Sequence, residues 1–148
     1  MIPAPLVVVD TSVAVKWFFD EPHSVRALHL LDAFKQRTLL PLAPDLIYSE
    51  FANAVWKRVA PDRLSPEVGA ATITTFLALP IEITPSPVLL LSAYRLALEY
   101  RQSVYDALFL ALSLDAGADL VTADEALYQA VHSHLPQVRW LGSWSASR

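Results

Sequence analysis

Carboxylates stand at the ends or on the faces of predicted elements, and four of them could act together: Asp10, Glu50, Asp106 and Asp124. Asp10 and Asp124 each follow an apolar run with strand character, and the carboxyl ends of parallel strands meet at one edge of a sheet. Gathered carboxylates repel one another unless a cation neutralises them, and an all-oxygen set selects a hard ion such as Mg²⁺ or Mn²⁺. Such an ion can activate water for attack on phosphorus. The pattern therefore predicts metal-dependent chemistry on a phosphate ester.

Each acid also has a purely structural explanation. Asp124 could cap the helix that starts at the next residue, and Asp106 completes a capping box that begins at Ser103. Glu50 could be a solvated residue of a helix. Asp10 is the hardest to explain in this way, because a carboxylate that follows a strand buried on both faces needs polar partners or a cation.

Composition limits the function further. The 148 residues are 54% hydrophobic, contain no cysteine and carry a formal net charge of −4. We expect one domain over residues 1–142 and a loose tail over 143–148. The negative charge is the wrong sign for gripping nucleic acid by bulk electrostatics, so any phosphate binding must be local. The lack of cysteine fits a reducing interior, and we expect a cytoplasmic protein. Apolar runs are too short for a membrane helix, which needs roughly 18 residues.

Strands are predicted to alternate with helices. The expected strands are 6–9, 81–84, 119–124, which ends on its acid, and 138–142. The expected helices are 13–19, 24–36, 45–58, 65–79, 88–101, 103–117 and 125–131. This order is typical of an α/β three-layer sandwich with a central, mostly parallel sheet flanked by helices.

Three local expectations are open to a direct check. Residues 39–44 contain prolines and are expected to form an edge strand or an extended segment, since proline cannot donate to a central ladder. In the helix 24–36 an apolar stripe is expected to consist of Val25, Leu28, Leu31 and Phe34. Asp45 is expected to cap the next helix.

Three sequence segments that contain the acids resemble those of PIN domains, and specifically the VapC-type ribonuclease toxins of type II toxin–antitoxin systems. They are "VVVDTS" with Asp10, "SEFANAV" with Glu50, and "YDALFLALSLDAGADLVTAD" with Asp106 and Asp124. The segments occur in the family's order along nearly the whole chain. The resemblance implies a PIN-like fold and a metal-dependent endoribonuclease.

The resemblance also implies roles for these residues. Asp10 and Asp106 would bind the Mg²⁺ or Mn²⁺ most directly, and Asp124 would hold a second ion or an ordered water. Glu50 would bind metal or deprotonate the water, and the hydroxyls of Ser12 and Thr122 would support the cluster. RNA is the implied substrate, and a homodimer and a cognate antitoxin that covers the site are the implied partners. One or two of the adjacent aromatic residues 17–19 could lie against such a partner.

Alternative functions are weighed against the same residues. A phospho-acceptor receiver module needs a pair of acids at the end of its first strand, whereas Asp10 stands between Val9 and Thr11. A phosphoaspartyl phosphatase needs an acid two residues further on, where this chain has Ser12. A non-catalytic protein-binding domain stays open. Isolated basic residues on helices are usually solvated, so no binding role is assigned to Lys16, Lys57, Arg58, Arg63, Arg95 and Arg101.

Overall fold

A computed structural model describes residues 2–146 of the chain. Within these residues, a parallel sheet of five strands has the order β3-β2-β1-β4-β5. The strands are β1 (Leu6–Val9), β2 (Leu40–Pro44), β3 (Glu82–Thr84), β4 (Asp119–Thr122) and β5 (Val138–Trp140). The predicted alternation of strands and helices is confirmed, and so is the parallel sheet.

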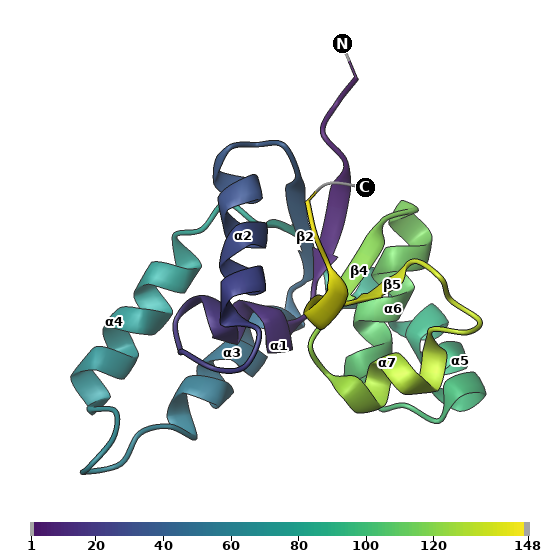
Figure 1. The fold of residues 1–148 in the computed structure, drawn as a ribbon. Coiled ribbons are helices and arrows are strands. Elements are labelled where there is room, and N and C mark those ends of the chain that lie inside the picture. The colour runs from purple at the N-terminus through teal and green to yellow at the C-terminus, as the bar shows by residue number, and fades with distance from the viewer. Residues whose placement is uncertain (1, 147–148) are drawn as a thin grey trace.

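Helices cover both faces of this sheet, as Figure 1 shows: α1 to α4 lie on one side and α5 to α7 on the other. They are α1 (Thr11–Ala14), α2 (Ser24–Lys35), α3 (Leu46–Trp56), α4 (Pro66–Leu77), α5 (Leu90–Tyr100), α6 (Val104–Ala116) and α7 (Glu125–Val131). Short 3-10 turns occupy Val15–Trp17, Ser86–Val88 and Leu141–Ser143. The result is the expected three-layer sandwich.

The order of the strands places a topological switch point beside β1. From β1 the chain moves outward to β2 and β3, and it then returns across the sheet to β4 on the other side of β1. Right-handed crossovers put the first group of helices on one face and the second group on the other. Ligands of open α/β sheets bind at such a point, outside the carboxyl ends of the strands.

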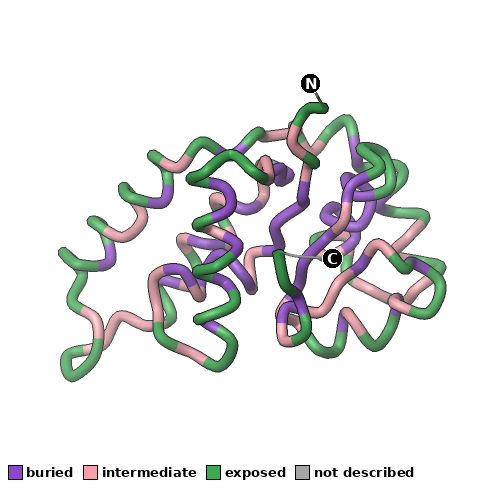
Figure 2. The backbone as a smooth tube through the Cα atoms, turned by 45° about the horizontal axis from the view of Figure 1, so that its top comes forward, coloured by how far each residue is buried: buried purple, intermediate pink, exposed green. Residues whose placement is uncertain are grey.

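The core is continuous from the sheet into both helical layers. Figure 2 shows buried backbone along the central strands and along the inward turns of the helices. Phe76 of α4 is 1% exposed and stacks on Phe51 of α3, with ring centroids 3.9 Å apart. The same ring meets Trp17 and Phe18 edge-on or tilted. The aromatic residues that follow α1 therefore belong largely to the protein's own core.

The expectation of an edge position for residues 39–44 is wrong, because β2 pairs with both β1 and β3. Each of its two prolines has a partner in one ladder, Pro41 opposite Val7 and Pro44 opposite Thr84, and lies beyond the end of the other ladder. Pro41 precedes the first β2–β3 pair, Leu42↔Glu82, and Pro44 follows the last β1–β2 pair, Val8↔Leu42. Neither proline therefore removes a hydrogen bond from an established ladder.

The stripe expected on α2 is also wrong, because Val25 and Leu28 are exposed. Residues spaced by three advance 300° per step around a helix, so four of them spread over half its circumference. The buried row is instead Ala27, Leu30, Ala33 and Phe34. The indole N–H of Trp17 donates to the carbonyl of Ala27 at 2.9 Å and fixes this rotation.

Two further expectations need correction. The side chain of Asp45 does not cap α3 and instead accepts hydrogen bonds from the backbone N–H and hydroxyl of Ser86. The segment 143–148 is not loose at its start, because Trp144 is buried and its carbonyl accepts a hydrogen bond from Arg26 at 2.7 Å. Its last two residues lie outside the described range. Among the helices that the structure describes, none is long and apolar enough to cross a membrane.

The stacked aromatic core makes a direct prediction about stability. Replacing Phe76 with Ala should lower the free energy of unfolding by about 3–5 kcal/mol, because a fully buried ring is lost and leaves a cavity. The neighbouring Leu77 is 56% exposed, and Leu77→Ala should change it by less than about 0.5 kcal/mol. Urea denaturation measures both values. Equal losses in the two variants would contradict the packing described here.

Candidate active site

Asp10 lies at the carboxyl end of the central strand and is 6% exposed. Its backbone carbonyl accepts from the N–H groups of Val13 and Ala14 and so starts α1, yet its side chain makes no capping bond to that helix. The carboxylate is therefore free to face the switch point. Helix capping does not explain this acid.

Two hydroxyls hold the Asp10 carboxylate in place. Ser12 and Thr122 each donate to its Oδ2 at 2.7 Å. Each hydroxyl oxygen also accepts a hydrogen bond from a backbone N–H in the turn after β4. The N–H of Ala123 donates to Ser12 at 2.9 Å, and the N–H of Asp124 donates to Thr122 at 3.0 Å. Because these N–H groups occupy the hydroxyl lone pairs, the hydroxyl protons point to Asp10. Oδ1 is left as the oxygen available to a ligand.

Asp124 and Asp106 reach the same place from two helix starts. Asp124 caps α7 by accepting the N–H of Leu127 at 3.1 Å through Oδ1, and it also faces the cleft. Asp106 lies in the first turn of α6, where its own N–H is capped by Ser103 at 3.1 Å. Asp124 therefore caps a helix and lines the cleft at the same time. The positive end of each helix dipole stabilises negative charge here.

Glu50 joins the cluster from the opposite wall. It projects from α3, and the Thr11 hydroxyl donates to its Oε1 at 2.8 Å. A cleft of about 320 Å³ contains all four predicted acids together with a small set of neighbours from α1 and α3. The residues lining the cleft are Asp10, Thr11, Ser12, Glu50, Asn53, Ala54, Lys57, Arg58, Asp106 and Asp124.

The acids of the cleft are hard to ionise together. Burial is the main reason that the pKa of Asp10 is raised to about 6, and the charges of Asp106 and Asp124 add to it against the two hydroxyl bonds. Burial likewise raises the pKa of Glu50 and of Asp106, and neighbouring carboxylates raise both further. The site therefore favours either protons or a cation among these groups.

The donor chemistry of the cleft fits a hard divalent ion. The predicted ligands are all carboxylates, and Asp10 has one oxygen turned from its hydroxyl partners. Among the described residues that line the cleft there is no histidine. Oxygen ligands of this kind suit Mg²⁺ or Mn²⁺. Within the described residues, no three acidic or histidine side chains already form a metal site. Two observations therefore support a divalent ion here: the ligands are carboxylates, and their negative charges lie close enough together to raise one another's pKa.

Several cleft residues had no role in the sequence analysis. Thr11, which orients Glu50, is one. A row formed by Asn53 and Ala54 of α3 and by Lys57, the residue that follows its last turn, is another. The signal for the row is its spacing, because residues three, four and seven positions after Glu50 lie on the same face of a helix.

Taken together, the switch-point cleft and its acids define a parallel α/β domain with an acidic centre. Residues 7–132 match the family model described as the PIN domain. This span is most of the chain, and the chain therefore belongs to the PIN domain family. A search of the curated proteins found no match.

Solved structures share this fold. PAE2754 of Pyrobaculum aerophilum is 23% identical with a TM-score of 0.61, over 86% of this chain and 79% of that one. A chain of VapBC2 from Rickettsia felis, bound to a DNA fragment from its promoter, is 16% identical with a TM-score of 0.63, over 91% and 96%. VapC20 of Mycobacterium tuberculosis, a toxin that cleaves the sarcin-ricin loop, is 14% identical with a TM-score of 0.64, over 84% and 95%.

The raised pKa of Asp10 predicts how stability depends on pH. The folded protein keeps this proton up to about pH 6, whereas the unfolded chain loses it near 3.8, so the free energy of unfolding falls as the pH rises between these values. In chelator at pH 8, Asp10→Asn should therefore be more stable than wild type, by up to about 3 kcal/mol. The difference should shrink towards pH 4.

Urea denaturation from pH 4 to 8 measures this difference. Asp62→Asn is the matched control, because Asp62 is exposed in the loop between α3 and α4 and its replacement should have little effect at any pH. If Asp10→Asn is no more stable than wild type at pH 8, the Asp10 carboxylate is not destabilising in the folded protein.

Proposed function

We propose that this chain is a metal-dependent endoribonuclease that hydrolyses RNA phosphodiester bonds. The observation that carries the proposal is the gathering of four carboxylates in one cleft at the switch point of a PIN domain. These acids come from four separate segments, and their burial and mutual repulsion raise the pKa of Asp10 in particular. Packing alone does not require four carboxylates to lie in one cleft, where burial and mutual repulsion destabilise their charged forms.

Each acid has a proposed role. Asp10 and Asp106 would hold Mg²⁺ or Mn²⁺, with Asp124 binding a second ion or positioning a water. When bound, such an ion supplies positive charge to the phosphate and lowers the pKa of water. Glu50, whose pKa is raised, is suited to accept the proton of the attacking water at its free oxygen or to bind metal. Ser12 and Thr122 would position Asp10 rather than touch the RNA.

We further propose that the nuclease is the toxin of a toxin–antitoxin pair and is held silent by a cognate antitoxin. The structural likeness to a VapBC2 chain and to the toxin VapC20 supports this role. A homodimer is the proposed assembly, and the cytoplasm, where RNA and a reducing interior coexist, is the proposed location. The antitoxin would cover the acidic cleft.

The test is the cleavage of a mixed RNA pool that includes ribosomal RNA. Purified, antitoxin-free protein should produce fragments with Mg²⁺ or Mn²⁺ and none with chelator. Asp106→Asn, which removes one proposed metal ligand, should lower the cleavage rate by at least about 100-fold while circular dichroism shows an intact fold.

The variant lane also controls for a contaminating nuclease. Equal cutting by wild type and Asp106→Asn would reject the assignment of this cleft as the active site. A lack of cutting by wild type in every metal would reject the nuclease proposal in favour of a binding domain.

A further inference from the structure

An RNA strand brings one negative charge per nucleotide to a cleft whose walls already carry four acids. Ions held by those acids would neutralise the phosphate that is cut, but the phosphates on either side of it need a separate source of positive charge. The chain as a whole has a net charge of −4 and supplies no general attraction. Of the described residues that line the cleft, two are basic: Lys57 and Arg58.

Arg58 is already committed to the protein itself. Its guanidinium pairs with Glu21 at 2.5 Å, donates to the carbonyl of Ala54 at 2.7 Å and lies 4.8 Å from the ring centre of Phe19. Glu21 also pairs with Lys16 at 3.3 Å. Glu21 thus pairs with two cations at once, and this ion pair network occupies the guanidinium of Arg58 and fixes the segment after α1 against the end of α3.

Lys57 is more exposed than Arg58 and, among the described residues, has no ion-pair partner. It lines the same cleft. It also follows Glu50 by seven positions, so two helical turns bring both side chains to the cleft face of α3.

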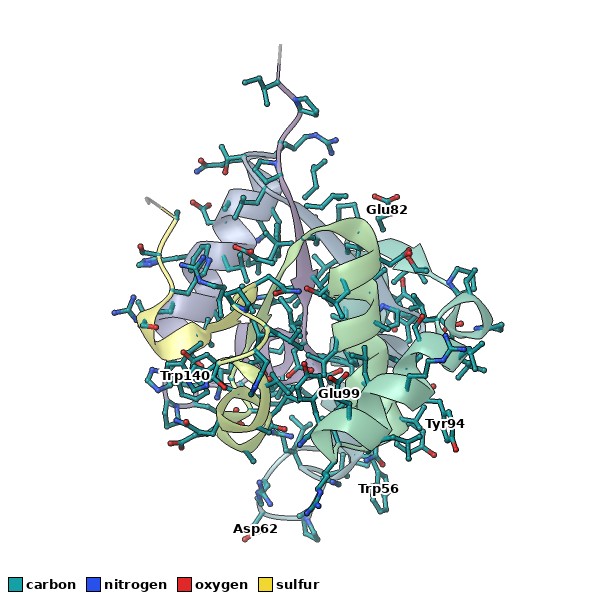
Figure 3. All side chains as sticks on the ribbon, turned by 90° about the vertical axis from the view of Figure 1, so that its right-hand side faces the viewer. Trp56, Asp62, Glu82, Tyr94, Glu99 and Trp140 are labelled. Atoms are coloured by element: carbon teal, nitrogen blue, oxygen red, sulfur yellow. The ribbon has the colours of Figure 1, made fainter. Side chains whose placement is uncertain are left out.

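Figure 3 shows how accessible this end of α3 is. The labelled Trp56, which directly precedes Lys57, and Asp62 of the following loop mark the outer edge of the molecule. Glu82 at the start of β3 lies at the opposite end. Lys57 is exposed at this outer end of α3. The flexible lysine stem lets the ammonium follow a phosphate.

We propose that Lys57 binds a backbone phosphate of the RNA next to the bond that is cut. The inference rests on the proposed nuclease function and adds a residue that binds substrate. A contact to phosphate positions the strand without reading its sequence. It acts on the affinity for RNA and its salt dependence, and it leaves the chemical step unchanged.

The experiment compares wild type with Lys57→Gln, Lys57→Arg and a matched control, Lys35→Gln. Lys35 is an exposed lysine at the end of α2 that leads into the start of β2, away from the acidic cleft. We expect Lys57→Gln to raise KM about 5- to 10-fold at low salt, with kcat within twofold of wild type. The slope of log(kcat/KM) against log[salt] should become shallower by about 0.7. Lys57→Arg and Lys35→Gln should behave as wild type.

A binding measurement separates this proposal from the nuclease proposal. Fluorescence anisotropy of a labelled RNA oligonucleotide, with Mg²⁺, compares Asp106→Asn with the double variant that also carries Lys57→Gln. The double variant should bind more weakly by the same factor. If wild type cleaves RNA but Lys57→Gln keeps its KM and salt slope, or loses kcat alone, the role of Lys57 is overturned. If wild type neither cleaves nor binds RNA, both proposals fail.

Discussion

The site depends on one buried carboxylate at the end of the central strand. Asp10 is 6% exposed and lines the cleft, and its charge would be hard to keep there without partners. The hydroxyls of Ser12 and Thr122 supply these partners, and both are oriented by the backbone of the turn after β4. The switch point brings that turn beside β1, so topology and hydrogen bonding determine the position of the acid together.

The gathering of acids in the cleft lowers the stability of the folded protein, and the apolar core offsets this loss. Burial and like charges raise the pKa values of three acids, which means that the folded state disfavours their ionised forms. Against this the protein sets a continuous apolar core in which Phe76 connects α4 with α3 and with the turn after α1. Helix α3 contributes to both, because Phe51 packs in the core while Glu50 lines the cleft.

Much of the fold was predictable, because the period of apolar residues and the acids at strand ends are local signals. The predictions for β2, α2 and Trp144 failed because each depends on tertiary contacts: where a neighbouring strand begins, which carbonyl Trp17 reaches, and what Arg26 binds. Thr11 and Lys57 were missed for a related reason. The sequence alone does not show whether a hydroxyl or an ammonium faces a cleft, because this depends on the rotation of the helix.

The hydrogen bonds of Asp10 also limit how this side chain can bind an ion. One oxygen of Asp10 is taken by two hydroxyls, and one oxygen of Asp124 is taken by the N–H of Leu127. The two hydroxyls occupy both lone pairs of the Asp10 oxygen, so this side chain would offer a single oxygen to an ion, whereas the capping oxygen of Asp124 accepts one hydrogen bond from the described residues and keeps a lone pair. Large, high-coordination ions such as Ca²⁺ gain from two-oxygen chelation by one carboxylate, whereas small octahedral ions do not require it. The turn after β4, which orients the two hydroxyls, therefore determines that Asp10 would bind such an ion through one oxygen.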